Sequence, residues 1–84
     1  NEEFILYPNP VVDKFTMRLE DNIDDEILVV VSDVFGKEQF SKIIMTSATD
    51  NTIAVDLERK LPPGIYTVVA TNNDKVFKKK IVVK

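Results

Sequence analysis

The chain has 84 residues, of which 44% are hydrophobic and 30% are charged, and its formal net charge is −3. This composition indicates one soluble globular domain, argues against disorder, and gives no general attraction to nucleic acid or to an anionic membrane. Cysteine and histidine are both absent, which excludes disulfides, thiolate metal sites and the commonest general base.

The first predicted strand, over 3–7, is a short apolar run that ends in the segment LYPNP. Because proline has no N–H to give to a sheet, Pro8 ends the strand and places it at a sheet edge. Asn9 is held extended because it precedes Pro10. The local interpretation is a rigid entry into the domain, followed by a loop over 8–13.

Alternation of apolar and polar residues predicts further strands at 14–20, 51–57 and 65–71. Each has one face toward a core and one toward water. The range 26–32 is apolar on both faces over Ile27–Val31, which predicts a central strand. Strands at 37–45 and 75–83 complete a set of seven. The residues expected inside are Phe15, Met17, Leu19, Ile53, Val55, Leu57, Tyr66, Val68 and Ala70.

Turn signals separate these strands. The sequence from Asp33 to Gly36 predicts a hairpin turn in which Asp33 bonds nearby backbone and Gly36 takes a positive φ. An acidic turn, a polar loop and an asparagine-rich hairpin turn are predicted over 21–25, 47–51 and 72–74. Seven short strands at this spacing predict an all-β fold, a seven-stranded immunoglobulin-like antiparallel β-sandwich.

The turn LPPGIY is the most informative one. Pro63 and Gly64 suit the two central positions of a type II turn. Tyr66 stands where sandwich folds place a tyrosine corner, in which the phenol bonds back to the backbone of the preceding crossover. The alternative is that Tyr66 is a core aromatic whose hydroxyl meets water.

Catalytic chemistry is not expected. The serines have no histidine partner for a hydrolase triad, and the acidic residues lie mostly on outward faces or in turns. No Gly-rich phosphate loop is present, and we expect neither a cofactor nor a catalytic metal. A structural calcium at the turn Asp21–Glu26 stays open beside a plain acidic turn. The longest apolar run has five residues, far short of the roughly 18–20 that span a bilayer.

Charge is distributed unevenly. Lys75–Lys84 contains five lysines and no acid, a charge of +5, whereas the other 74 residues carry six basic and fourteen acidic groups, a charge of −8. Lysines on a final edge strand block edge-to-edge pairing, and Lys79 falls on the apolar face, where an inward charge does the same. Recognition by a partner is the second interpretation. Nucleic-acid binding is the third, because Phe77 shares the core face with Ile81 and Val83.

Four segments together resemble a known family. They are LYPNPVVDKFTMRLE, VVVSDVFGK, IAVDLERKLPPGIYTVVAT and KVFKKKIVVK, which are similar in order and spacing to the C-terminal sorting domain of the type IX secretion system, the Por secretion tail of Bacteroidetes. The positions that match the family's motifs are Tyr7, Pro8, Asn9 and Pro10 at the opening, Asp33 and Gly36 in the middle, Leu61, Pro63, Gly64 and Tyr66 in the later turn, and Lys78, Lys79, Lys80 and Lys84 in the closing strand.

The resemblance implies a non-catalytic secretion signal. Residues 1–84 would be a single C-terminal sorting domain, cut on its N-terminal side from a larger cargo protein. The cargo would cross the periplasm, engage the outer-membrane translocon, and reach the cell surface or the medium, in many cases after a cell-surface sortase cuts. We expect the last strand to be recognised through its edge, its lysines or both. Neither nucleic acid nor a transmembrane segment is expected.

The alternative from another class is a fibronectin-III-like or carbohydrate-binding sandwich that serves as an accessory or adhesion module. The segment LPPGIYTVV fits such a module about equally well. A sugar binder would need exposed aromatics in a row. The seven aromatics mostly alternate inward, which argues against a stacking platform; they are Phe4, Tyr7, Phe15, Phe35, Phe40, Tyr66 and Phe77.

Overall fold

Seven strands and no helix make up the part of the chain that the computed structural model describes, which is residues 4–19, 26–45, 51–73 and 75–84. Each strand lies within a residue of its predicted ends. The strands are β1 (Phe4–Tyr7), β2 (Lys14–Leu19), β3 (Glu26–Ser32), β4 (Glu38–Met45), β5 (Thr52–Asp56), β6 (Gly64–Asn72) and β7 (Lys75–Val83).

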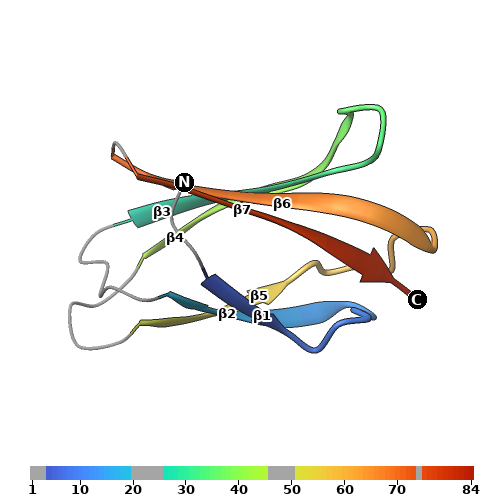
Figure 1. Cartoon of the computed structure of the whole chain (residues 1–84), viewed down its shortest axis with the longest axis horizontal. Helices are drawn as coiled ribbons and strands as arrows, with labels where there is room; N and C mark the ends of the chain where they lie inside the picture. The colour runs from blue at the N-terminus through green and yellow to red at the C-terminus, as the bar shows by residue number, and fades with distance from the viewer. Residues whose placement is uncertain (1–3, 20–25, 46–50, 74) are drawn as a thin grey trace.

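The strands form two antiparallel sheets packed face to face, with the order β1-β2-β5 in one and β4-β3-β6-β7 in the other (Figure 1). This confirms the predicted all-β sandwich. As expected, β1 lies at a sheet edge and β3 lies centrally. In the constant-type immunoglobulin fold the fourth strand pairs into the sheet formed by the first, second and fifth strands. Here β4 pairs with β3 instead, so the larger sheet gains an edge strand.

The core lies between the sheets and comes from alternate residues of every strand except β4. All nine residues expected inside are buried, and Phe77, Ile81 and Val83 join them. Three of the buried core residues lie outside the strands, namely Val11, Leu57 and Leu61. On β4, Phe40 and Ile44 are only half-buried against the core. The larger sheet therefore covers the core mainly with β3, β6 and β7.

The outer face of the larger sheet is open to solvent although it carries apolar residues. Leu28 is 40% exposed and Ile65 is 53% exposed, while Val30 and Val69 between them are half-buried. The sequence correctly indicated apolar residues on both faces of β3. In the structure, however, only the inner face of β3 is covered by the second sheet, because nothing in the described chain packs on the other side.

The hairpin between β3 and β4 has the predicted turn. Oδ1 of Asp33 accepts hydrogen bonds from the backbone N–H groups of Phe35 and Lys37, both at 2.9 Å. Gly36 has a φ of 83°, a left-handed conformation that glycine adopts without a Cβ penalty. In the last hairpin, where the asparagine-rich turn is predicted, Asn73 has a positive φ of 52°, a conformation that asparagine tolerates.

The crossover before β6 confirms one prediction and corrects another. The hydroxyl of Tyr66 donates a 2.6 Å hydrogen bond to the carbonyl of Pro62, which is the expected tyrosine corner. The prediction of a type II turn at Pro63-Gly64 is wrong. Gly64 already begins β6, with a φ of 158° instead of the roughly 80° that such a turn requires. Its pairing with Val83 extends the backbone there.

Candidate functional site

The terminal strand β7 lies at the edge of the larger sheet and pairs with β6 without a break from Lys75 to Val83. Its side chains alternate in burial along this length. Phe77, Ile81 and Val83 are buried, while Lys78 and Lys80 are exposed. The predicted recognition lysines therefore do not form one cluster, because strand alternation sends neighbours to opposite faces.

Lys79 points toward the other sheet, as its position on the apolar face predicts. Its Nζ donates to the carbonyl oxygen of Phe4 at 3.3 Å and lies 5.9 Å from the centre of the Phe4 ring. That ring packs edge-on against Phe77, with centroids 6.1 Å apart. Lys79 thus joins β7 to β1 across the open side of the sandwich, and its ammonium already has a partner inside the domain.

The opening motif lies against the other end of β7. Oδ1 of Asn9 accepts a hydrogen bond from the N–H of Val82 at 3.1 Å. The N–H of Val11 donates to the carbonyl of Val82 at 2.7 Å, and the N–H of Lys84 donates to the carbonyl of Val11 at 2.9 Å. Val11 and Val83 form an isolated parallel bridge. The remaining motif residues, Tyr7, Pro8 and Pro10, are exposed, and both prolines follow cis peptide bonds.

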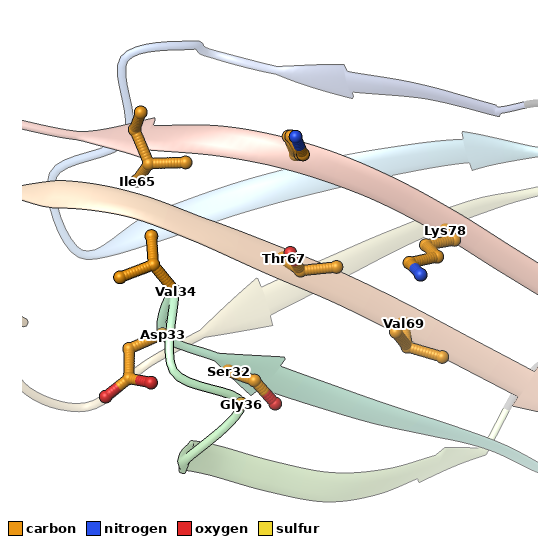
Figure 2. Close-up of a pocket in the computed structure, with 9 residues that line it drawn as sticks. Ser32, Asp33, Val34, Gly36, Ile65, Thr67, Val69 and Lys78 are labelled. Carbon is orange, nitrogen blue, oxygen red and sulfur yellow. The ribbon is translucent and has the colours of Figure 1, made fainter.

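Lys78 and Lys80 line a shallow groove of about 480 Å³ on the outer face of the larger sheet. Strand register explains its polar centre, because Ser32, Thr67 and Lys80 lie opposite one another on β3, β6 and β7. Figure 2 shows Val34 and Ile65 at one end of the groove and Val69 beside Lys78 at the other. The groove thus combines apolar walls, two hydroxyls and two cations.

The carboxylate of Asp33 borders this groove but points away from Thr67 and Lys78 (Figure 2). It accepts from the backbone of Lys37 and Phe35 and, at 3.2 Å, from Nε2 of Gln39. The hydrogen bond from Lys37 is the largest influence that lowers the pKa of Asp33 below its ordinary value of 3.8. Asp33 and Gly36 therefore shape the β3–β4 turn beside the groove, and the Asp33 carboxylate is committed to that turn.

The later motif serves the fold, and none of its four residues lines the groove. Leu61 is buried in the core, Pro63 is exposed, and Tyr66 closes the crossover through its bond to Pro62. Ile65, which lies between the motif residues Gly64 and Tyr66, lines one end of the groove. The structure thus brings the middle motif and Lys78 and Lys80 together, and places the opening motif at the end of β7.

Sequence reasoning missed an exposed apolar tip on the β3–β4 hairpin. Phe35 is 92% exposed and Val34 is 66% exposed. The available signal was an apolar pair inside a four-residue turn, where neither side chain has a strand face to bury it. Tyr7, the other well exposed aromatic, lies on β1, in the other sheet. The exposed aromatics therefore do not form the row that a sugar-binding platform needs.

Within the described ranges, no group of three acidic side chains comes close enough to hold a metal ion. Four of the residues at the acidic turn, Asp21, Asn22, Asp24 and Asp25, lie outside those ranges together with Ile23, so the structural calcium stays an open prediction. The same described ranges contain no helix of the length and apolar character that would carry the chain across a bilayer.

The fold and the site together define an immunoglobulin-like sandwich domain whose terminal strand is accessible at a sheet edge. The chain belongs to the family of the secretion system C-terminal sorting domain, the sorting signal of type IX secretion, whose family model matches residues 5–84. Domains of this family are non-catalytic sorting signals that act with type IX machinery on a linked cargo. A comparison with curated proteins finds no match.

Proposed function

We propose that this domain directs a cargo linked to its N-terminal side through the outer-membrane type IX translocon, and that β7 is the strand the machinery recognises. The cargo would pass through the periplasm and end at the cell surface or in the medium. A cell-surface sortase is a further proposed partner. The domain would act by binding alone, with no catalytic activity and no nucleic-acid partner.

The observation that carries this proposal is the position of Lys78 and Lys80. Both side chains are exposed on an edge strand whose neighbours Phe77, Lys79 and Ile81 hold it to the domain. Exposed side chains on an edge strand of a folded domain offer a machine a handle that does not require unfolding. Lys84 is also exposed, while its backbone is held by Val11. We therefore assign contact to Lys78, Lys80 and Lys84, and strand anchoring to Lys79.

The test uses residues 1–84 fused to the C-terminus of a fluorescent reporter that an N-terminal leader exports to the periplasm of a host with type IX secretion. We expect the reporter to reach the cell surface. The triple change K78Q/K80Q/K84Q should retain it in the periplasm, whereas K14Q/K42Q/K60Q, which removes the same charge elsewhere, should not. Removing 76–84 should also retain it.

The point substitutions matter more than the truncation, because the truncation also removes the core residues Phe77, Ile81 and Val83. Circular dichroism and urea unfolding of the purified domains establish that each triple variant is folded. Surface delivery of the folded K78Q/K80Q/K84Q variant at the wild-type level would overturn the assignment of contact to these lysines. Failure of the unmodified fusion to leave the periplasm would overturn the sorting function itself.

A further inference from the structure

We propose that the outer edge of β7, from Val76 to Lys80, binds an extended acidic segment of the recognition partner as an additional strand of the larger sheet. The inference rests on the proposed function, in which β7 is the strand that the secretion machinery recognises. It specifies how a partner would contact that strand. It goes beyond that function in naming the binding mode and the sequence pattern of the partner.

The orientation of Val82 determines which backbone groups of β7 face outward. Its N–H and its carbonyl are both bonded to the opening segment, at Asn9 and Val11, and therefore point away from β6. Backbone groups alternate in direction along an antiparallel pair, and the β6–β7 register has no bulge. The N–H and carbonyl groups of Val76, Lys78 and Lys80 consequently also point away from β6.

These three residues leave six backbone groups at the edge without a hydrogen-bond partner in the described part of the chain. The span between them covers four residue steps, roughly 14 Å at about 3.4 Å per residue. A five-residue extended segment matches this length. The protein itself demonstrates such an addition further along the edge, where Val11 bridges Val83 in parallel.

Charge decides which kind of segment fits. An added strand places one side chain opposite each edge residue, with Cβ atoms roughly 4.5–5.5 Å apart. Lys78 and Lys80 are exposed and make no hydrogen bond or ion pair within the described chain, so acidic side chains opposite them would be paired favourably. A second copy of this chain would instead oppose lysine to lysine if its own β7 joined this span. The same two lysines thus favour an acidic partner and disfavour self-association.

The residue between the two acidic positions would lie on the core side of the sheet, opposite Lys79. There it would meet the half-buried stem of Lys79, whose ammonium is bonded to the carbonyl of Phe4. An apolar side chain suits this position because no free charge or unpaired polar group awaits it. The expected partner pattern is therefore acidic, apolar, acidic, in an extended conformation.

Binding of a capped nine-residue peptide of alternating glutamate and valine to the 84-residue chain tests the inference. We expect saturable binding by calorimetry, together with slowed amide hydrogen exchange at Val76, Lys78 and Lys80. Two control peptides should bind at least about tenfold more weakly. One alternates lysine with valine, and the other is the glutamate peptide with N-methyl groups on the amides that would face β7.

The matched protein variants are K78E/K80E and K42E/K60E. Each takes the formal net charge from −3 to −7, so only position distinguishes them. We expect K78E/K80E to bind the glutamate peptide at least about tenfold more weakly than the wild type and to bind the lysine peptide instead. K42E/K60E should bind both peptides as the wild type does. Equal binding of the N-methylated peptide, or equal weakening by both variants, would overturn strand addition.

Absence of binding to the glutamate peptide would overturn this docking mode alone. Whether the domain sorts cargo is decided separately by the reporter fusion, which does not depend on any peptide. Export of the reporter without peptide binding therefore leaves the proposed function in place. Peptide binding without export leaves a strand-accepting edge that does not serve secretion in that host.

Discussion

The side-chain oxygen of Asn9 accepts a hydrogen bond from the backbone N–H of Val82, 73 residues further along the chain. Two more hydrogen bonds, both through Val11, fix Val82 and Lys84 beside it. The opening motif is therefore part of the immediate surroundings of β7. It occupies the C-terminal part of the β7 edge and leaves the part that carries Lys78 and Lys80 open.

Replacing Asn9 by alanine should loosen the end of β7. The N–H of Val82 would lose its acceptor, and a lost hydrogen bond of this type costs about 0.5–1.5 kcal/mol. Urea unfolding should show a lower free energy of unfolding, and amide exchange at Val82 should accelerate. The control is Ser41→Ala, an exposed position on β4, where we expect a change within about 0.5 kcal/mol. Unchanged exchange at Val82 in the Asn9 variant would contradict the assignment.

Tyr66→Phe should destabilise the domain while Tyr7→Phe should not. Tyr66 is 5% exposed and its hydroxyl bonds to Pro62, whereas the hydroxyl of Tyr7 is on an exposed side chain without a bond in the described chain. We expect a loss of about 0.5–1.5 kcal/mol for Tyr66→Phe. That corresponds to a fall in melting temperature of several degrees, at roughly 4–8 °C per kcal/mol for a domain of this size. Equal melting temperatures for the two variants would contradict a structural role of the tyrosine corner.

Acid should weaken the domain partly through Asp33. Its pKa in the folded state lies below the ordinary value of 3.8, chiefly because the carboxylate accepts a hydrogen bond from the backbone of Lys37. The stability that the ionised group contributes is fully present above the unfolded-state pKa, and it is lost as the pH falls through the folded-state pKa. Unfolding measured from pH 5 to pH 2 should therefore decline less steeply in Asp33→Asn than in the wild type. Parallel pH profiles would contradict this role.

Lys79→Ala should cost stability that Lys78→Ala does not. The stem of Lys79 is half-buried and its ammonium contacts both the carbonyl and the ring of Phe4, which together are worth about 1 kcal/mol. Lys78 is exposed without such contacts, so its removal should change the free energy of unfolding by less than about 0.5 kcal/mol. Chemical denaturation of the two variants under identical salt conditions compares them directly. An equal loss in both would show that the inward contact contributes nothing.

Local patterns in the sequence predict much of this fold. Alternation in β2, β5 and β6 identifies the buried faces, because a half-buried strand requires a period of two. The Asp33 turn and the Tyr66 corner are local as well, since each depends on residues within four positions. The prediction of a turn at Pro63-Gly64 failed for a non-local reason. Pairing of Gly64 with Val83 draws the glycine into β6, which no property of the dipeptide reveals.

The arrangement of the candidate site depends on contacts between distant residues, which local patterns do not contain. The lysine run is visible in the sequence, and so is the alternation that turns Lys79 inward. The contacts of Asn9 and Val11 with Val82 and Lys84 form only when the two sheets pack against each other. The groove likewise requires the order β3-β6-β7, which places Ser32, Thr67 and Lys80 in one row.

The parallel bridge between Val11 and Val83 has a mechanical consequence for a domain that is pulled by its ends. Tension directed toward the N-terminal side of Val11 and the C-terminal side of β7 acts along the two segments in opposite directions. The hydrogen bonds from Val11 to Val82 and from Lys84 to Val11 would then be sheared at the same time. In an antiparallel hairpin pulled apart at its open end, by contrast, the bonds would break one after another. The variant Val11→Pro lacks the N–H that bonds to Val82. In single-molecule stretching we expect this variant to unfold at a lower force than the unaltered domain.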